Sequence, residues 1–444
     1  MENIFFAENE KNVYICKRED KCNPKTKTRM RRILFYLALT LCITASTYAY
    51  DFEVDGIYYN ILSEEERTCE VTHCAEDPGE LDGTCYAGNI TIPASVTHAG
   101  TTYAVTSIGD QAFYECWHLT SVVIPSSVTS IKDFAFFGCD VLTSVSLTNS
   151  VTHVGIEAFC GCNHLSAPIY TDKMFIYLPG THKDEYVIPS GIEEICGYAF
   201  YSNQLPSVVI PNSVTTIGAD AFSSCHGLRS ITIPSSVKTI GDGAFSWTGL
   251  KTVTIPGTLT SVSSAAFAYC PHLTSVTLQE GVEEIGEAAF YCCEELVTVN
   301  MPHSLKKIGD QAFSDCYMLK ALTLPAGLEH IGAYAFAFCR SLLSVTNLAP
   351  QPQSITRGVF GLPTDKPIAE EAVLHVMPGC RDAYQNAEGW KDFGTIVEDA
   401  ASTTSITTAT PGTSSSTYDL QGRCLPATPR RALYIKDGRK IVVR

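Results

Sequence analysis

Residues 217–239 read IGADAFSSCHGLRSITIPSSVKT, and residues 240–261 repeat the phrase as IGDGAFSWTGLKTVTIPGTLTS. The pattern recurs along the chain at a spacing of 23 residues in most steps, 22 in two steps and 41 in one. A fixed period of this kind predicts a repeat architecture. We therefore expect ten units between residues 108 and 346. The units open at these residues: Ile108, Ile131, Val154, Ile195, Ile217, Ile240, Val262, Ile285, Ile308 and Ile331.

The sequence of one unit predicts one strand and one turn. In residues 230–233 apolar side chains alternate with Ser and Thr, which is the two-residue period of a half-buried strand. Pro234 ends this strand because it lacks a backbone donor. We expect Gly218 to serve a tight turn with positive φ, and Ala221 and Phe222 to form a short helical turn. A lone unit buries too little apolar surface to offset its conformational entropy, so the units must stack into a solenoid of parallel strands.

Many of the 19 cysteines follow the repeat. Eight of them occupy one position of the unit, where a small apolar side chain with a weak S–H donor suits a buried turn. We interpret them as packing residues rather than disulfides or metal ligands. They are Cys116, Cys139, Cys162, Cys225, Cys270, Cys293, Cys316 and Cys339.

The sequence predicts no catalytic residue, metal or cofactor. It contains none of the glycine-rich phosphate-binding, nucleophile-elbow or zinc-protease phrases that mark those chemistries. His118, His164 and His272 share one position of the unit, but two coils of spacing would separate the first pair by roughly 10 Å. A single zinc ion needs its ligands at about 2 Å, so we expect no zinc site there.

The repeated phrase I-G-x-x-A-F-x-x-C-x-x-L, with I-P at the strand end, resembles the BspA-like leucine-rich repeat family. The resemblance covers residues 108 to about 345. It implies a leucine-rich repeat solenoid with one parallel strand per repeat of about 23 residues, joined by short helical turns and capped at both ends. It also implies a secreted or surface-exposed binding protein, often adhesive, without enzymatic activity.

Residues 1–49 are expected to be a leader whose segment 30–49 is a secretory signal peptide. Met30, Arg31 and Arg32 precede an apolar run, and a small-x-small site ends at Ala49. Whether residues 1–29 are translated in the cell is left open. Of the 31 basic and 47 acidic residues, nine basic and five acidic ones lie in the leader, so the remainder has a net charge of −20. This acidity disfavours nucleic acid or an anionic membrane as partner, and we expect no transmembrane segment in the mature chain.

Caps are expected on both sides of the repeats. Residues 50–107 read as an N-terminal cap with a half-repeat, beginning with a hairpin at Asp55-Gly56. Residues 63–83 look acidic and loop-like, and two of Cys69, Cys74 and Cys85 could form a disulfide whose pairing the sequence leaves open. Residues 166–187 read as an insertion that adds a hairpin. Residues 347–399 read as a C-terminal cap with a strand, a short helix and a closing strand.

The last residues form a separate signature. Residues 400–417 are rich in Ser and Thr and read as a linker. Residues 418–444 contain YDLQGR and a basic terminal strand, similar to the C-terminal sorting signals of type IX secretion. Ala432 stands where those signals usually carry Gly, and the segment is shorter than a complete sorting domain. A short stabilising hairpin is the alternative.

The outward face of the predicted strands carries two rows of small polar side chains. One interpretation is that these residues only pack between parallel neighbours. The other is a broad, uncharged platform for a protein or a glycan, which lacks the deep pocket that a small molecule needs. The candidate binding residues are Ser230, Thr232, Thr252, Thr254, Ser275, Thr277, Thr298, Asn300 and Thr323.

These features favour a secreted or cell-surface protein on the bacterial outer surface. We expect it to bind an extracellular protein or glycan, either of the host matrix or of other cells, and to act in adhesion. Attachment to the cell envelope is left open. The alternative is a passive structural spacer without a specific ligand.

Overall fold

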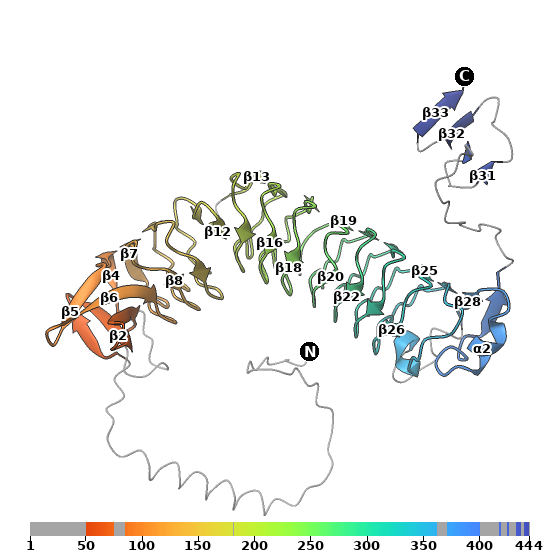
Figure 1. The fold of residues 1–444 in the computed structure, drawn as a ribbon, viewed down its shortest axis with the longest axis horizontal. Coiled ribbons are helices and arrows are strands. Elements are labelled where there is room, and N and C mark those ends of the chain that lie inside the picture. The colour runs from red at the N-terminus through yellow and green to blue at the C-terminus, as the bar shows by residue number, and fades with distance from the viewer. Residues whose placement is uncertain are drawn as a thin grey trace, which may run out of the picture. The chain divides into compact units, whose positions relative to one another are not determined.

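The computed structural model describes residues 50–74, 85–180, 182–361 and 371–399, together with the backbone of four strands between residues 417 and 443. The leader with its signal peptide and most of the linker lie outside the described residues. Figure 1 shows the repeats as coils that stack in chain order. Within the described residues, no helix has the length and apolar character needed to cross a bilayer.

Each coil contributes two parallel strand positions, where the sequence predicted one. The longer position, at the S-V-x-I phrase, builds what we call the first ladder, in four consecutive sheets. Neighbouring strands in each sheet are parallel and in register, as predicted. The strands are β4 (Ala87–Thr91), β7 (His118–Val123), β9 (Ser144–Ser146), β13 (Tyr186–Val187), β15 (Ser207–Val209), β17 (Ser230–Ile231), β19 (Thr252–Ile255), β21 (Ser275–Leu278), β23 (Thr298–Asn300), β25 (Ala321–Leu324), β27 (Ser344–Asn347), β28 (Val373–Val376) and β29 (Thr395–Glu398).

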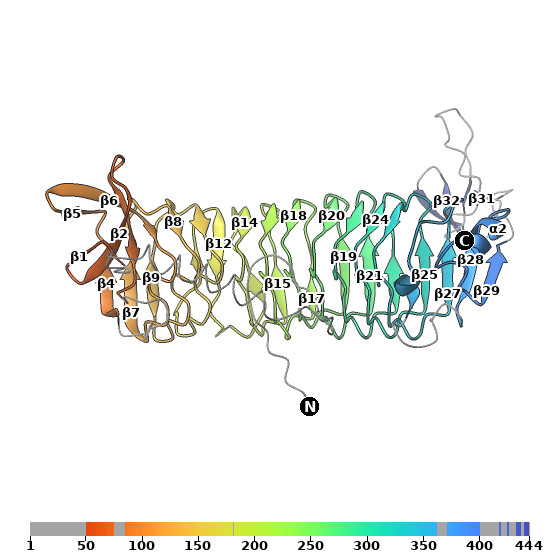
Figure 2. The ribbon, with the colours of Figure 1, turned by 90° about the horizontal axis from the view of Figure 1, so that it is seen from below.

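The unit-opening residues form a second ladder. The openers are buried except for the half-buried Val154, and neighbouring openers within one sheet pair with each other, for example Ile217 with Ile240. Most of these strands have two residues, too few for alternation to reveal them in the sequence. Figure 2 shows β8, β14, β18, β20 and β24 in one row and β9, β15, β19, β21 and β25 in another. The strands are β3 (Thr68–Thr72), β6 (Thr101–Ile108), β8 (Ser130–Ile131), β10 (His153–Val154), β12 (Met174–Tyr177), β14 (Glu194–Ile195), β16 (Thr216–Ile217), β18 (Thr239–Ile240), β20 (Ser261–Val262), β22 (Glu284–Ile285), β24 (Lys307–Ile308) and β26 (His330–Ile331).

The segment after each opener is a succession of tight turns. We expected a short helical turn here. Ser223 N–H donates to Asp220 O at 3.0 Å, and Cys225 N–H donates to Phe222 O at 3.3 Å, so two overlapping β-turns follow one another. Two residues of this unit have positive φ, Asp220 at 51° and Ser224 at 61°. This alternation of right- and left-handed residues turns the chain without building a helix.

Gly218 serves close packing rather than the positive φ that we expected. It is absent from the residues with positive φ, and a Cβ at this position would lie 2.4 Å from the backbone nitrogen of Gly197. Gly241 in the next coil has the same constraint, with a Cβ 2.3 Å from Ala219 N. The glycine after the opener therefore lets neighbouring coils approach at the turn.

The core is a column of phenylalanine rings. The rings of Phe222 and Phe245 stack with centroids 5.1 Å apart and an angle of 4° between their planes, and Phe245 and Phe267 repeat the arrangement at 5.1 Å and 5°. All three side chains are fully buried. The Ala-Phe phrase of each unit thus places one ring directly on the ring of the preceding coil.

The repeated cysteines confirm the packing interpretation. All eight thiols are buried and outside disulfides, and seven of them donate to the phenylalanine carbonyl of the preceding coil. Cys225 Sγ, for example, lies 3.0 Å from Phe200 O. Where the cysteine is replaced, Asn203 Nδ2 donates to Leu178 O at 2.9 Å, and Thr248 Oγ1 donates to Phe245 O at 3.0 Å. The other donors are Cys139, Cys162, Cys270, Cys293, Cys316 and Cys339.

Residues 166–187, which the sequence presented as an insertion, contain a shortened coil. Strand β11 (Ile169–Tyr170) pairs antiparallel with β12, and β12 pairs parallel with β14, with Phe175 opposite Ile195. Phe175 therefore occupies an opener position and stacks on Phe200 with centroids 5.0 Å apart. It divides the step of 41 residues into 21 from Val154 and 20 to Ile195. All four residues of β12 are buried, so the hairpin is a layer within the stack and not an appendage at its edge.

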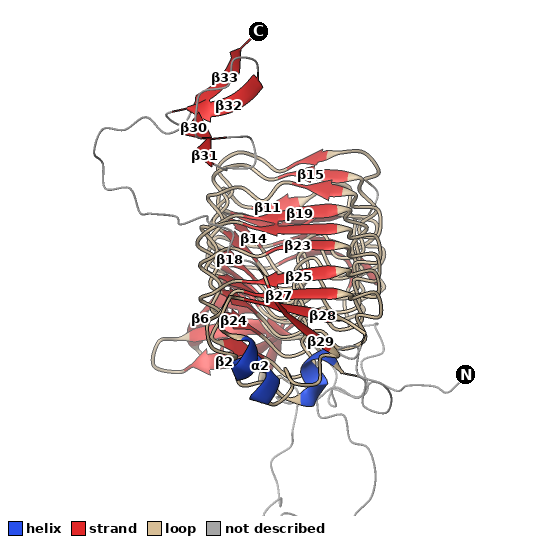
Figure 3. Cartoon of the chain, turned by 90° about the vertical axis from the view of Figure 1, so that its right-hand side faces the viewer, coloured by secondary structure: helices blue, strands red, loops and turns tan. Residues whose placement is uncertain are grey.

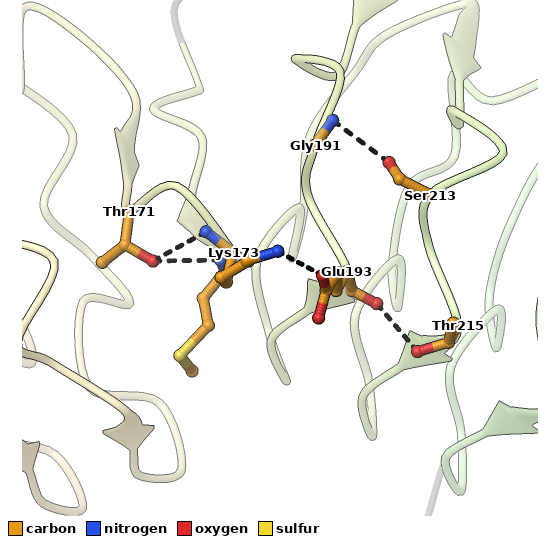
Figure 4. A network of polar contacts seen from close by, with 7 residues as sticks. Thr171, Lys173, Gly191, Glu193, Ser213 and Thr215 are labelled. Carbon is orange, nitrogen blue, oxygen red and sulfur yellow. Dashed lines mark hydrogen bonds and ion pairs between the residues drawn. The ribbon is translucent and has the colours of Figure 1, made fainter.

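Polar contacts join this divergent coil to the regular ones. Thr171 Oγ1 accepts from Met174 N–H at 3.0 Å. Figure 4 shows Lys173 paired with Glu193 of the next coil. The carbonyl of Glu193 accepts from Thr215 Oγ1 of the next coil at 3.2 Å. A short series of contacts therefore crosses three coils at the point where the repeat pattern is weakest.

The N-terminal cap extends the second ladder. Strands β1 (Phe52–Val54) and β2 (Ile57–Ser63) form the expected hairpin, with positive φ at Asp55 and Gly56, and β5 (Ser95–His98) pairs with β6. Residues 68–72 are not a loop, as the sequence suggested, but strand β3, which pairs with β2 and β6. The disulfide joins Cys74 to Cys85, and Cys69 is free.

Strand β3 contains a buried carboxylate, Glu70. Acidic residues of this kind led us to expect an exposed loop at this position. Glu70 is 8% exposed, and its Oε2 lies 2.7 Å from Lys132 Nζ and 3.1 Å from Ser107 Oγ. A charge that pairs across coils in this way is compatible with a strand interior.

The C-terminal cap covers the last phenylalanine ring. It contains the 3-10 helix η2 (Arg357–Phe360) and helix α2 (Arg381–Asn386), which lie with β28 and β29 at the end of the coils in Figure 3. Phe360 stacks on Phe336, and Trp390 and Phe393 pack against Phe360. Trp390 Nε1 donates to Gln353 O at 2.8 Å. The tail forms a separate antiparallel sheet of β30 (Thr417–Tyr418), β31 (Cys424–Leu425), β32 (Ala432–Lys436) and β33 (Arg439–Val443).

Candidate binding faces

The nine candidate residues all lie on the outward side of the first ladder. Seven are exposed, and Ser275 and Thr277 are half-buried. The residues between them point inward: Val253 is 3% exposed and Val276 is fully buried. The alternation that the sequence predicted for these strands is therefore confirmed.

Six of the nine come together in one sheet. Thr252, Ser275 and Thr298 are opposite one another in β19, β21 and β23. The second row is formed in the same register by Thr254, Thr277 and Asn300. Ser230 belongs to β17 and Thr323 to β25, in the flanking sheets, and Thr232 directly follows β17.

The six residues present hydroxyl and amide groups to solvent without a net charge. In the described part of the chain, one hydrogen bond links two of the nine side chains, from Thr298 Oγ1 to Ser275 Oγ at 3.1 Å. The remaining groups can donate to or accept from a partner. Small side chains on a flat sheet suit an extended contact rather than an enclosed pocket.

Exposed valines flank this polar face, although they were not among the candidate binding residues. Val187 and Val209 lie opposite each other in β13 and β15 and are 61% and 44% exposed. Beside them is a hollow of about 300 Å³ whose lining includes Ser230 and Thr232. The signal was present in the sequence, because Val209 occupies an outward position that Ser or Thr fills in other coils.

The second ladder carries a more polar groove of about 580 Å³. Its lining includes Ser261, Glu284 and Lys307, and Lys307 Nζ pairs with Glu284 Oε1 at 2.5 Å. Asp242 and Asp310 at its edge each accept a backbone N–H from the next coil, at 3.1 and 2.8 Å. These carboxylates therefore have a structural role. The sequence interpretation could not place this groove because it predicted one strand per unit and did not predict the second ladder.

The histidines of the repeated position pair with acidic groups instead of converging. His164 Nδ1 lies 2.6 Å from Asp140 O and 3.4 Å from Asp140 Oδ1, and His272 Nδ1 lies 3.6 Å from Glu295 Oε1. Across the described residues, no group of three or more His, Cys, Asp or Glu side chains could hold a metal ion. Burial raises the pKa of the Cys225 thiol to about 12 and that of the half-buried Cys292 thiol to about 11, so both stay protonated at neutral pH.

Parallel strands that recur about every 23 residues, with one buried phenylalanine per coil, define a leucine-rich repeat protein. A family model described as BspA type leucine rich repeat region (6 copies) matches residues 106–177, 180–275 and 238–362, together more than half of the chain. The chain belongs to this family. No curated protein matches the chain.

Several solved structures are similar to this chain. A leucine-rich repeat protein from Bacteroides ovatus has 26% identity, with 79% of this chain and 100% of that chain covered and a TM-score of 0.38. A leucine rich cell surface protein from Faecalibacterium prausnitzii has 22% identity, coverage of 79% and 95%, and a TM-score of 0.38. The pneumococcal vaccine antigen PcpA has 18% identity, coverage of 81% and 100%, and a TM-score of 0.39.

Proposed function

We propose that this chain is a secreted, surface-displayed binding protein that contacts an extracellular protein or glycan through the polar rows of its first ladder. The observation that carries the proposal is the register of β19, β21 and β23, which aligns Thr252, Ser275 and Thr298 in one row and Thr254, Thr277 and Asn300 in the other. A face that repeats the same small polar groups on successive coils is suited to a partner that is itself extended. The role is adhesion to the host matrix or to other cells.

Chemistry on this face favours binding over catalysis. Within the described residues, the nine side chains form one hydrogen bond among themselves, from Thr298 Oγ1 to Ser275 Oγ, and none to an acidic or basic side chain that would activate a nucleophile. Each contact contributes little, so useful affinity needs an area near the 1,600 Å² of a standard interface. In this proposal residues 108–346 are the binding body, and residues 50–107 and 347–399 cap its two ends.

Export is the second part of the proposal. The apolar run after Arg32 directs secretion, and the segment 418–444 acts as a type IX sorting signal that brings the chain to the outer surface. The family membership supports a surface role. The four-stranded sheet of β30 to β33 gives the tail a fold of its own, which suits a segment read by a secretion machinery.

A ligand screen tests the binding proposal. The purified full chain is passed over immobilised extracellular-matrix proteins and glycans, and the heat-unfolded chain serves as the control. We expect the folded chain to be retained by at least one ligand that does not retain the unfolded chain. If no ligand retains the folded chain, the binding proposal is wrong and a passive spacer is the better description.

A further inference from the structure

The hollow of about 300 Å³ on the first ladder has an apolar floor. It lies over the sheet of β13, β15 and β17. Val208 and Ile210 in its lining are buried, and Ile231 is half-buried. The residue equivalent to Ile231 in the next coil, Val253, is buried. The surface is therefore more open at β17 than at the polar rows of β19, and solvent reaches apolar groups there.

Exposed valines extend this apolar surface across two coils. Val187 and Val209 lie opposite each other in β13 and β15, and both are exposed. In β19 and β21 the position of Val209 is occupied by Thr254 and Thr277. Threonine has the same branched shape, so the strand itself does not require valine here. A single exposed valine is ordinary, but two in register beside a hollow form a continuous apolar patch.

One carboxylate gives the hollow its charge. Glu185 is the one charged residue among the described residues that line it. Its Oε2 accepts from Ser207 Oγ at 2.9 Å, which holds the exposed carboxylate against the sheet. In the described part of the chain, no ion pair joins Glu185 to a basic side chain. Lys183 and Asp184 precede it, and their charges offset each other. The hollow therefore has a negative edge.

A lysine side chain matches both the apolar floor and the negative edge. Its four-carbon stem packs on apolar surface while its ammonium group stays at an acceptor or in water. Glu185 precedes Val187 by two residues, roughly 7 Å along the strand, and a stem of this length spans that distance. Ser207 already occupies Oε2 of the carboxylate. The single-point ammonium therefore suits the other oxygen better than the two-pronged guanidinium of arginine.

We propose that this hollow is a specificity site of the first ladder, which takes a lysine side chain from an extended segment of a partner protein. The stem packs on Val187 and Val209, and the ammonium pairs with Glu185. The site depends on the proposed function in one respect, since the first ladder must face the partner. It narrows the partner to a protein and assigns its selection to the coils of β13 and β15.

The test measures how a fluorescein-labelled decapeptide of alternating threonine and lysine binds the full chain. Fluorescence anisotropy gives the Kd at about 0.15 M salt, where long-range attraction to an acidic chain is screened. Glu185→Gln keeps an acceptor for Ser207 and removes the charge, so the Kd should rise at least about threefold. Val187→Thr/Val209→Thr keeps the branched shape and removes two methyl contacts, which should also raise the Kd at least about threefold. Circular dichroism verifies folding.

Each hollow variant has a matched control elsewhere on the solenoid. Val123→Thr makes the same exchange at the same strand position of β7, where this valine stands in register between Thr91 and Ser146. Glu329→Gln removes an exposed carboxylate that directly precedes β26 of the second ladder. Both controls should leave the Kd within about twofold of the wild type.

Two altered peptides separate the stem from the charge. Acetyl-lysine removes the charge, and 2,4-diaminobutyrate keeps the charge on a stem two methylenes shorter. Each peptide should bind the wild type at least about threefold more weakly. The proposal is overturned if the lysine peptide does not bind the wild type, if either hollow variant keeps full affinity, or if the diaminobutyrate peptide binds equally well. None of these outcomes involves the partner from the ligand screen, so the binding function itself is decided separately.

Discussion

The phenylalanine and the cysteine of each coil stabilise the stack in different ways. Phe222 is fully buried between the rings of Phe200 and Phe245, at centroid distances of 4.6 and 5.1 Å. Cys225 fills a small site and satisfies the carbonyl of Phe200. Removing the ring leaves a cavity along the column, whereas exchanging sulfur for oxygen keeps both the volume and a donor.

Phe222→Ala should therefore lower the free energy of unfolding by about 3–5 kcal/mol. Cys225→Ser should lower it by only about 1 kcal/mol, the size of one altered buried hydrogen bond. Urea titration monitored by circular dichroism measures both. A larger loss in the serine variant would refute the packing role of the cysteine column.

The Cys225 thiol also makes stability depend on alkaline pH. Burial raises its pKa in the folded protein from 9.0 to about 12. Because the folded-state pKa is raised, the stabilising contribution is complete below pH 9 and is lost as pH rises from 9 toward 12. The wild type should lose up to about 1.4 kcal/mol per pH unit through this group, and Cys225→Ser should not. The wild-type advantage of about 1 kcal/mol at pH 7 should thus vanish near pH 10, and Cys225→Ser should be the more stable protein at about pH 10.5. A constant difference would contradict the burial of this thiol.

Residue roles that depend on composition and period could be read from the sequence, and those that depend on neighbouring coils could not. The buried role of Cys225 follows from its recurrence in a repeat. The reason for Gly218 does not, since a glycine needed for positive φ and one needed for close approach look the same in sequence. The sequence did not predict that Trp247 stacks on Tyr269. Both residues occupy a variable turn position, and only the stacking of the coils places their rings together.

At the scale of elements, the long strand of each coil was predictable and the short one was not. In β19 the sequence TVTI alternates over four residues, whereas β18 consists of Thr239 and Ile240 alone. Residues 166–187 show the same limit. Phe175 lacks the Ile-Gly opener, so the shortened coil is recognisable only from its pairing with Ile195. The acidic residues around β3 masked a strand because the partner of Glu70, Lys132, lies far along the chain.

The close approach of coils at the second ladder predicts a sharp contrast between two glycines. In Gly241→Ala the new Cβ would lie 2.3 Å from Ala219 N, so the backbone must shift and stability should fall by about 1–3 kcal/mol or more. In Gly327→Ala the nearest atom would be His303 O at 3.4 Å, an ordinary contact. This matched control should change the melting temperature little. Equal melting temperatures for the two variants would contradict the spacing of the coils.

At the scale of the whole molecule, we could predict the family, the stacking of the coils and the polar outward face, because the residues that indicate them recur in many repeats. The leader and the sorting role of the tail stay predictions, since residues 1–49 lie outside the described part and the fold of a tail sheet does not reveal its receptor. The ligand is not encoded in any repeated residue. The repeats predict the polar face of the first ladder. The choice of partner depends on details of shape, which the period and the composition do not contain.

The signal peptide gives one direct prediction. Cleavage after Ala49 should leave Tyr50 as the first residue of the exported protein. N-terminal sequencing of protein recovered from the envelope or the medium measures this. Recovery of chains that begin at Met1 or Met30 would show that the segment is not removed.

The central claim is that the first ladder, and not merely the acidic solenoid, binds the partner found in the ligand screen. Thr232→Glu, Thr254→Glu and Thr277→Glu together place three negative charges on the first ladder in successive coils. The matched control, Thr216→Glu, Thr239→Glu and Ser261→Glu, places three negative charges on the second ladder in successive coils, where Glu194 and Glu284 occur naturally. Kd for that partner is measured for both triple variants and the wild type, with circular dichroism to verify folding. We expect the first variant to lose at least about tenfold in affinity and the control to stay within about twofold. Unchanged binding by the first variant, or an equal loss in both, would contradict the claim.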